Sequence, residues 1–137
     1  AYLLVDGGRL STVEYISATR AIPRDKYNVA LSTVLAGELL GMRLTYLEAG
    51  SGASVPVPAE MISYIHERSN LPLIIGGGIA SVQDITAAYD SGADIVVVGN
   101  AFERNPNRII EYVNRVADYN RLLAEQAKVS SLGDHSA

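Results

Sequence analysis

Residues 73–79, Leu-Ile-Ile-Gly-Gly-Gly-Ile, decide the fold class of this chain. The stretch is a short β-branched run that stops in glycine, as a parallel strand does when both of its faces are covered. A second such run follows at residues 95–100, Ile-Val-Val-Val-Gly-Asn. Glycine has no Cβ, so a ligand oxygen can approach the backbone N–H groups at these strand ends. With a helix N-terminus behind each end, the pair predicts neighbouring strands that share a phosphate-binding edge.

The rest of the chain alternates between strand and helix patterns. Strands are expected at residues 2–5 and 44–48, and four strand–helix units in succession predict a parallel sheet with right-handed crossovers. Residues 9–24 are too long for a plain connection and include a candidate short helix over residues 11–16; such an excess often covers an active site. Helices are expected over about 25–40, 59–69, 81–91 and from Asn105-Pro106 to about 129, with residues 130–137 a polar, fraying tail.

Two architectures fit such units, an open flavodoxin-like sheet and part of a (β/α)8 barrel. Glycine and polar residues follow every strand, and barrels bind phosphate in the loops after their seventh and eighth strands. The 137 residues are little more than half of a typical barrel of about 250. We therefore expect residues 1–129 to form strands five to eight of a TIM barrel, its C-terminal half. A half barrel exposes two apolar strand edges, which predicts pairing with a complementary N-terminal half or with a second copy.

The composition limits the class of protein. Of the residues, 48% are hydrophobic and 19% are charged, which is typical of one globular domain. The net charge of −4, with no run of Lys or Arg, argues against a nucleic-acid partner. The absence of cysteine excludes disulfides and thiolate metal sites. No apolar stretch has the length of a membrane span and no leader pattern is seen, so a cytoplasmic protein is expected, with a peripheral membrane contact left open.

Several motifs together resemble the geranylgeranylglyceryl phosphate synthase family, which includes bacterial prenylglyceryl phosphate synthases. The most specific motif is Tyr-Leu-Glu-Ala-Gly-Ser-Gly-Ala at residues 46–53. The glycine motifs at residues 76–79 and 98–101 follow it in the family's order and spacing. Ile-Pro-Arg-Asp-Lys at residues 22–26 and Ala-Gly-Glu at residues 36–38 add to the likeness, which extends from Tyr2 to about Tyr112.

The resemblance implies a Mg²⁺-assisted prenyltransferase, a (β/α)8 barrel that joins sn-glycerol 1-phosphate to a polyprenyl diphosphate through an ether bond. It implies that Tyr46, Glu48 and Ser51 hold the glycerol phosphate, and that the glycines cradle its phosphate. The family's magnesium-binding acidic residue lies in the first half of its barrel, so no metal ligand is assigned here. The full substrate-binding set implied is Tyr46, Leu47, Glu48, Ala49, Gly50, Ser51, Gly52, Gly76, Gly77, Gly78, Gly99 and Asn100.

The chemistry of the residues supports a catalytic role for Glu48 and Tyr46. Glu48 ends a strand just before a glycine-rich loop, where its carboxylate can accept a hydroxyl proton. The alternative is a loop cap or an ion pair with Arg43 or Arg24. Tyr46 lies two residues earlier, hence on the same face of the strand, where it either bonds the substrate or simply packs.

The remaining charged residues give weaker signals. Arg24 and Lys26 suit a clamp on a diphosphate, and equally a solvated helix start. His66 and His135 are expected to be solvated, and no His/Asp cluster has the spacing of a metal site. Two other functions stay open: a phosphate-binding isomerase, lyase or synthase on the same barrel, and a half barrel that forms a homo-oligomer and is inactive alone.

Overall fold

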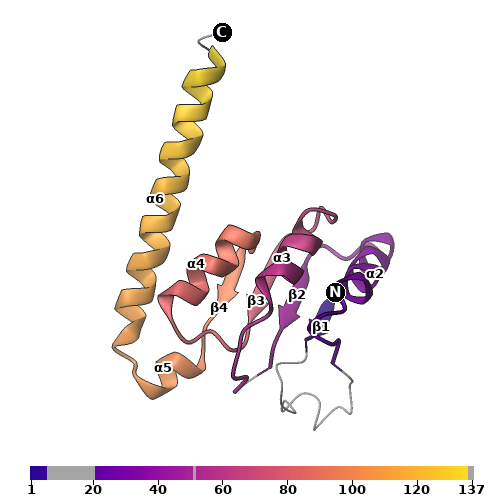
Figure 1. The fold of residues 1–137 in the computed structure, drawn as a ribbon. Helices are drawn as coiled ribbons and strands as arrows, with labels where there is room; N and C mark the ends of the chain where they lie inside the picture. The colour runs from indigo at the N-terminus through magenta and orange to yellow at the C-terminus, as the bar shows by residue number, and fades with distance from the viewer. Residues whose placement is uncertain (6–20, 51, 136–137) are drawn as a thin grey trace.

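A computed structural model describes residues 1–5, 21–50 and 52–135 (Figure 1). Its centre is a parallel sheet of four strands in the order β1-β2-β3-β4, so each strand pairs with the next one along the chain. The strands are β1 (Tyr2–Leu4), β2 (Thr45–Glu48), β3 (Leu73–Gly76) and β4 (Ile95–Val97). The helices are α2 (Tyr27–Leu39), α3 (Ala59–His66), α4 (Val82–Ser91), α5 (Asn100–Arg104) and α6 (Arg108–His135).

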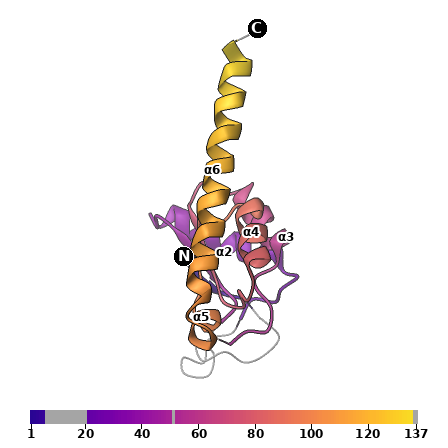
Figure 2. The same cartoon turned by 90° about the vertical axis from the view of Figure 1, so that its left-hand side faces the viewer.

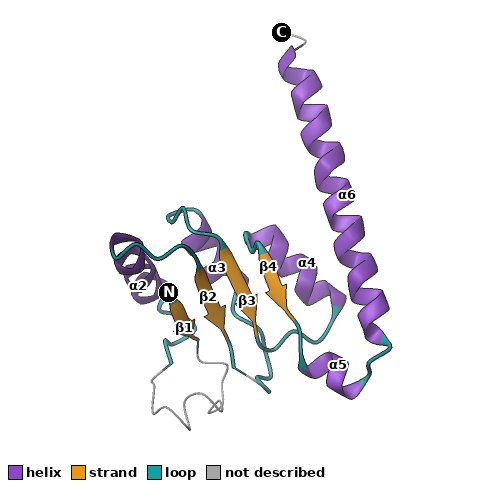
Figure 3. Ribbon diagram, turned by 180° about the vertical axis from the view of Figure 1, so that it is seen from behind, coloured by secondary structure: helices purple, strands orange, loops and turns teal. Residues whose placement is uncertain are grey.

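Helices cover one face of the sheet. Figure 1 shows α2, α3 and α4 in front of the strands, and Figure 3, from behind, shows the strands in front of the helices. Within β2, Thr45 and Leu47 are buried while Tyr46 and Glu48 are only half-buried, because alternate side chains point to opposite faces. The face that carries Tyr46 and Glu48 has no covering helix in the described part of the chain; we call it the bare face.

The core lies between the sheet and α2, α3 and α4. In β3, Leu73 and Ile75 are fully buried, and in α3 Met61, Ile62 and Ile65 face them at helical spacing. A second, smaller cluster joins α4 and α5 to α6. Its buried members are Ile79, Val82, Ile85, Ala101 and Tyr112.

Most of the expected elements are present. The Ser81 cap is confirmed, since its Oγ accepts a hydrogen bond from Asp84 N at 3.2 Å. Val5 lies beyond β1, in an isolated bridge to Ile22. The helix α5 was not predicted, because five residues are too few to show a helical period. The candidate helix over residues 11–16 lies outside the described residues.

The last helix is longer than expected. It continues through residues 130–135, where a fraying tail was expected, and ends at His135. Its 28 residues correspond to about 42 Å of helix. Figure 2 shows its C-terminal part rising beyond the rest of the fold. In the described residues, no helix combines the length and the apolar character needed to cross a membrane.

Candidate active site at the carboxyl edge of the sheet

The strand register brings the two predicted halves of the site together. Glu48 at the end of β2 is paired with Gly76 at the end of β3, and Gly76 is paired with Val97 of β4. Because the strands are parallel, all of these positions lie at the carboxyl edge of the sheet. The carboxylate residue and the glycine turns therefore occupy the same edge, as a shared substrate site requires.

The Tyr46 side chain lies against Gly76. A Cβ placed on Gly76 would lie 2.6 Å from the Tyr46 hydroxyl and 3.3 Å from its ring carbon Cζ. The phenol thus lies directly over the end of β3. Burial first, and then the charge of Glu48, raise the pKa of Tyr46 above its ordinary value, so the hydroxyl keeps its proton at neutral pH and can donate a hydrogen bond.

Gly77 and Gly78 lie where two loops meet. Both have positive φ, +83° and +73°. A Cβ on Gly77 would lie 2.7 Å from Gly50 N, and one on Gly78 would overlap the Val55 carbonyl. The loop after β2 is also tied to β3 by a hydrogen bond from Ala49 N to the Gly76 carbonyl at 2.9 Å. Packing and backbone conformation alone are therefore enough to require these two glycines.

Gly99 differs from the other glycines of the site. Its φ is −129°, and a Cβ built on it would meet no atom within 4 Å. Nothing in the packing of the described residues demands glycine here, and the residue is exposed. The backbone of Asn100 follows directly and begins α5. Compared with Gly76, Gly77 and Gly78, Gly99 thus has space beside its backbone for a ligand.

Tyr2 is a site residue that the sequence analysis missed. Its hydroxyl donates a hydrogen bond to Glu48 Oε2. Its ring centroid lies 5.4 Å from that of Tyr46, with 44° between the ring planes. The signal that could have found it is the register, which sets Tyr2 opposite Tyr46, but register between separate strands cannot be read from either strand alone.

The alternative ion-pair partners of Glu48 lie elsewhere. Arg43 precedes β2 and is therefore at the opposite end of that strand. Arg24 Nη2 donates a hydrogen bond to the Pro56 carbonyl at 2.6 Å, which ties the segment before α2 to the loop after β2. Lys26 forms the N-cap position of α2, and no side-chain hydrogen bond caps that helix. Glu48 is thus held by Tyr2, a neutral partner.

The other predicted residues fall into different surroundings. Leu47 and Ala49 are buried in the core, on the side of the sheet that faces the helices. Gly50 is buried and Gly52 is half-buried, and both have positive φ. Ser51 lies outside the described residues. His66 is exposed on α3, as expected.

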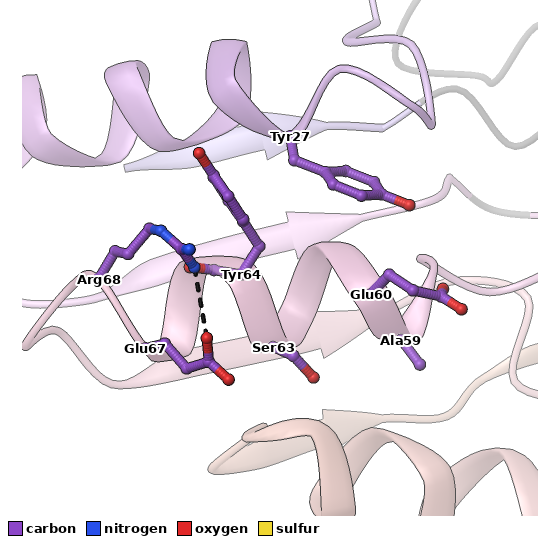
Figure 4. A pocket seen from close by; sticks show the side chains of 7 residues that line it. All are labelled: Tyr27, Ala59, Glu60, Ser63, Tyr64, Glu67 and Arg68. Atoms are coloured by element: carbon purple, nitrogen blue, oxygen red, sulfur yellow. Dashed lines mark hydrogen bonds and ion pairs between the residues drawn. The ribbon is translucent and has the colours of Figure 1, made fainter.

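Among residues 1–5, 21–50 and 52–135, no group of three or more His, Asp or Glu side chains could hold a metal ion. A groove of about 490 Å³ lies on α2 and α3, where Arg68 stacks 3.8 Å from the Tyr64 ring centroid and pairs with Glu67 at 3.4 Å (Figure 4). An apolar cavity of about 510 Å³ lies between α4, β4, α5 and α6. Neither contains Glu48 or the glycine turns.

A parallel strand–helix sheet with a carboxylate and glycine turns at its carboxyl edge is the arrangement expected for part of a (β/α)8 barrel, a class of protein whose ligand sites lie at this end of the strands. Residues 1–117 match the PcrB family, and the chain belongs to that family. The resemblance seen in the motifs is thereby confirmed.

Named relatives agree with the family. The chain is 44% identical over 124 residues to the geranylgeranylglyceryl phosphate synthase of Spirosoma linguale, covering 90% of this chain and 50% of the relative. It is 48% identical over 104 residues to the synthase of the same name from Flavobacterium johnsoniae, covering 76% of this chain and 43% of the relative. The chain thus spans about half the length of the curated relatives it matches.

A solved structure supports the fold. The (S)-3-O-geranylgeranylglyceryl phosphate synthase of Thermoplasma acidophilum, in complex with its substrate sn-glycerol-1-phosphate, matches with a TM-score of 0.77 at 36% identity. The match covers 86% of this chain and 47% of that one. The prediction of a parallel α/β fold that forms half of a TIM barrel is confirmed.

Proposed function

We propose that this chain is the C-terminal half of a prenyltransferase that joins sn-glycerol 1-phosphate to a polyprenyl diphosphate of the geranylgeranyl type. The product would be an ether-linked lipid precursor. The observation that carries the proposal is the position of Glu48 beside the glycine turns, at the carboxyl edge of a sheet that matches named synthases. The synthase of Thermoplasma acidophilum, which binds sn-glycerol-1-phosphate, supports the choice of the small substrate.

Glu48 is the proposed proton acceptor. In the reaction, a hydroxyl oxygen of glycerol phosphate forms a bond to C1 of the prenyl diphosphate. The bond between C1 and the diphosphate oxygen breaks, and the diphosphate leaves with the electron pair. The hydroxyl proton passes to the Glu48 carboxylate, which is half-buried on the bare face. Tyr46, whose hydroxyl keeps its proton, is the proposed donor to a substrate oxygen.

The phosphate is proposed to lie against the backbone of Gly99 and Asn100, beside the turn formed by Gly77 and Gly78. The open space at Gly99 favours this placement. The two glycines of the turn keep the loops in contact and so set the wall of the cradle. Ser51, in the same motif as Glu48, is proposed to add a hydroxyl donor.

We propose that Mg²⁺ takes part in the reaction, and we assign it no ligand among the residues of this chain. Magnesium would offset the charge of the diphosphate as it leaves. Its usual partners are carboxylates together with substrate phosphates, and the described residues provide no cluster of acidic side chains for it. The family resemblance places an acidic magnesium ligand in the first half of the barrel, and we propose that the complementary half supplies it.

The bare face indicates the partner. A complete barrel needs a complementary N-terminal half to cover this face and to pair with the edges of β1 and β4. The isolated chain is accordingly proposed to be inactive. We further propose that the protein forms a homo-oligomer and is cytoplasmic. It would make a peripheral contact with the membrane that holds the lipid substrate.

The test uses a barrel chimera: this chain joined to the half of the Spirosoma linguale synthase that has no counterpart in it. Isothermal titration would compare sn-glycerol 1-phosphate, its mirror image and unrelated sugar phosphates. We expect clear preference for sn-glycerol 1-phosphate and formation of the prenyl ether when a prenyl diphosphate and Mg²⁺ are added. Equal, weak binding of all the phosphates would contradict the proposed function.

A further inference from the structure

The bare face carries a tyrosine, Tyr2, that has no role in the proposed reaction as described above. Tyr2 of β1 is set opposite Tyr46 of β2 in the register, and their rings are 5.4 Å apart. Side chains at alternate strand positions share a face, so Glu48 lies on the bare face as well. Tyr2, Tyr46 and Glu48 thus form one cluster from two neighbouring strands.

The contact between Tyr2 and Glu48 joins side chains of two neighbouring strands. The Tyr2 hydroxyl reaches across to β2 and donates a hydrogen bond to Glu48 Oε2. This bond engages Oε2, and the other carboxylate oxygen, Oε1, remains available to a substrate. A glutamate side chain turns about several bonds, so without a partner its carboxylate would adopt several orientations at a half-exposed position.

The phenol is suited to remain the donor. Burial first, then the hydrogen bond to Glu48, then the negative charge of Glu48, and last an electrostatic contribution from Tyr46 raise the pKa of Tyr2 well above its ordinary value of 10.0. Its proton therefore stays on the phenol at neutral pH. The proton released by the substrate passes to Glu48 and not to Tyr2.

We propose that Tyr2 is a positioning residue for Glu48, holding the carboxylate with Oε1 directed at the hydroxyl of the bound glycerol phosphate. The inference rests on the proposed function, since it assumes that Glu48 accepts this proton. A base held out of line loses rate much more than it loses ground-state affinity, and a misplacement of about 1 Å costs on the order of 100-fold.

The first test is Tyr2→Phe in the barrel chimera. Phenylalanine keeps the ring against Tyr46 and removes only the hydroxyl. We expect kcat to fall roughly 10- to 100-fold, while the Kd of sn-glycerol 1-phosphate and the thermal midpoint stay nearly unchanged. A kcat equal to that of the parent, or a loss confined to substrate affinity, would overturn the inference.

The matched control is Tyr27→Phe. Tyr27 belongs to a similar ring pair, with its centroid 5.9 Å from that of Tyr64 and 42° between the planes, but it lies on the helical layer (Figure 4). This variant is expected to keep the parent kcat. A double-mutant cycle then adds Tyr2→Phe to Glu48→Gln. Because Tyr2 acts through Glu48, the second change should have little further effect, and fully multiplicative losses would overturn the inference.

A structural readout separates this inference from the proposed function. Crystal structures of the chimera with and without Tyr2→Phe are expected to show the Glu48 carboxylate in one orientation in the parent and rotated or divided among several in the variant. An unchanged carboxylate would overturn the positioning role, whatever reaction the protein catalyses. If the parent chimera forms no prenyl ether, the proposed function fails, and the orientation of Glu48 still decides the role of Tyr2.

Discussion

At the scale of single residues, Glu48 is the position where a substitution can remove the proposed proton acceptor and keep the shape of the side chain. We predict that Glu48→Gln in the barrel chimera lowers kcat by about 10²- to 10⁴-fold, because the amide keeps the shape and cannot accept the proton. The thermal midpoint should stay close to that of the parent, since the side chain is outside the core. Steady-state kinetics and a melting curve measure the two effects. If turnover barely changes, Glu48 positions the substrate and another group takes the proton.

The glycine turn offers a second test at this scale. Gly77 and Gly41 share nearly the same φ, +83° and +84°, but a Cβ on Gly41 would meet no atom within 4 Å while one on Gly77 would press on Gly50. Gly41→Ala is therefore expected to lose about 1 kcal/mol from backbone strain alone, and Gly77→Ala roughly 1–3 kcal/mol more. Urea unfolding measures both. Equal losses of unfolding free energy in the two variants would show that the loop with Gly50 can move away from residue 77 without loss of stability.

Gly99 provides the complementary case. Its φ is negative and its surroundings are open, so Gly99→Ala is expected to leave the free energy of unfolding within about 0.5 kcal/mol of the parent. If the phosphate lies against this backbone, the added methyl group should weaken binding of sn-glycerol 1-phosphate roughly tenfold or more. Isothermal titration provides the measurement. Unchanged affinity would move the phosphate site away from Gly99.

At the scale of elements, Glu38 joins the end of α2 to the segment between α3 and β3. Its Oε1 accepts hydrogen bonds from Ser69 Oγ at 2.5 Å and from Asn70 N at 3.0 Å. The bond from Ser69, followed by that from Asn70, lowers the pKa of Glu38 below its ordinary value of 4.5. A carboxyl group with a lowered folded-state pKa stabilises the fold above the unfolded value, and this contribution is lost as the pH falls through the folded value.

Glu38→Gln is therefore expected to lower the urea midpoint at pH 7, and the difference from the parent should shrink as the pH falls below about 4. Ser69→Ala removes the strongest cause of the shift and should reproduce part of this pH dependence. Unfolding curves of the barrel chimera at several pH values make the measurement. If the difference in urea midpoint between Glu38→Gln and the parent stays constant down to pH 3, the charge of Glu38 contributes nothing to stability.

The strands and their turns also show which features the sequence predicts and which it does not. The strands ending at Glu48 and Gly76 are predictable, because buried runs that stop at glycine are local patterns. The bond from Tyr2 to Glu48 is not, since it depends on the pairing of strands separated by a long connection. Likewise, the motif around Gly76 does not show that one glycine makes room for the Tyr46 ring while Gly99 faces open space. Those differences arise from tertiary packing.

At the scale of the whole molecule, the bare face and the sheet edges determine how the chain behaves alone. In the described region, the edge strands β1 and β4 each lack a neighbouring strand on their outer side, where β1 has an isolated bridge in which Ile22 N donates a hydrogen bond to the Leu4 carbonyl. Tyr2, Ile95 and Val97 are 51%, 53% and 41% exposed. Exposed apolar side chains beside an open edge favour association. The complementary half of a barrel would pair with the open strand edges and also cover the exposed apolar side chains.

We predict that the isolated chain of 14.6 kDa associates with itself in solution and that adding the complementary half replaces this association with a 1:1 complex. Light scattering coupled to gel filtration gives the masses. Ile95→Lys places a charge on the β4 edge and should reduce self-association, whereas Val129→Lys, on the exposed part of α6, should not. A chain that is monomeric at every concentration would show that its edges are protected without the other half. Inhibition of complex formation by Ile95→Lys would, in contrast, place the complementary half on the same edge that drives self-association.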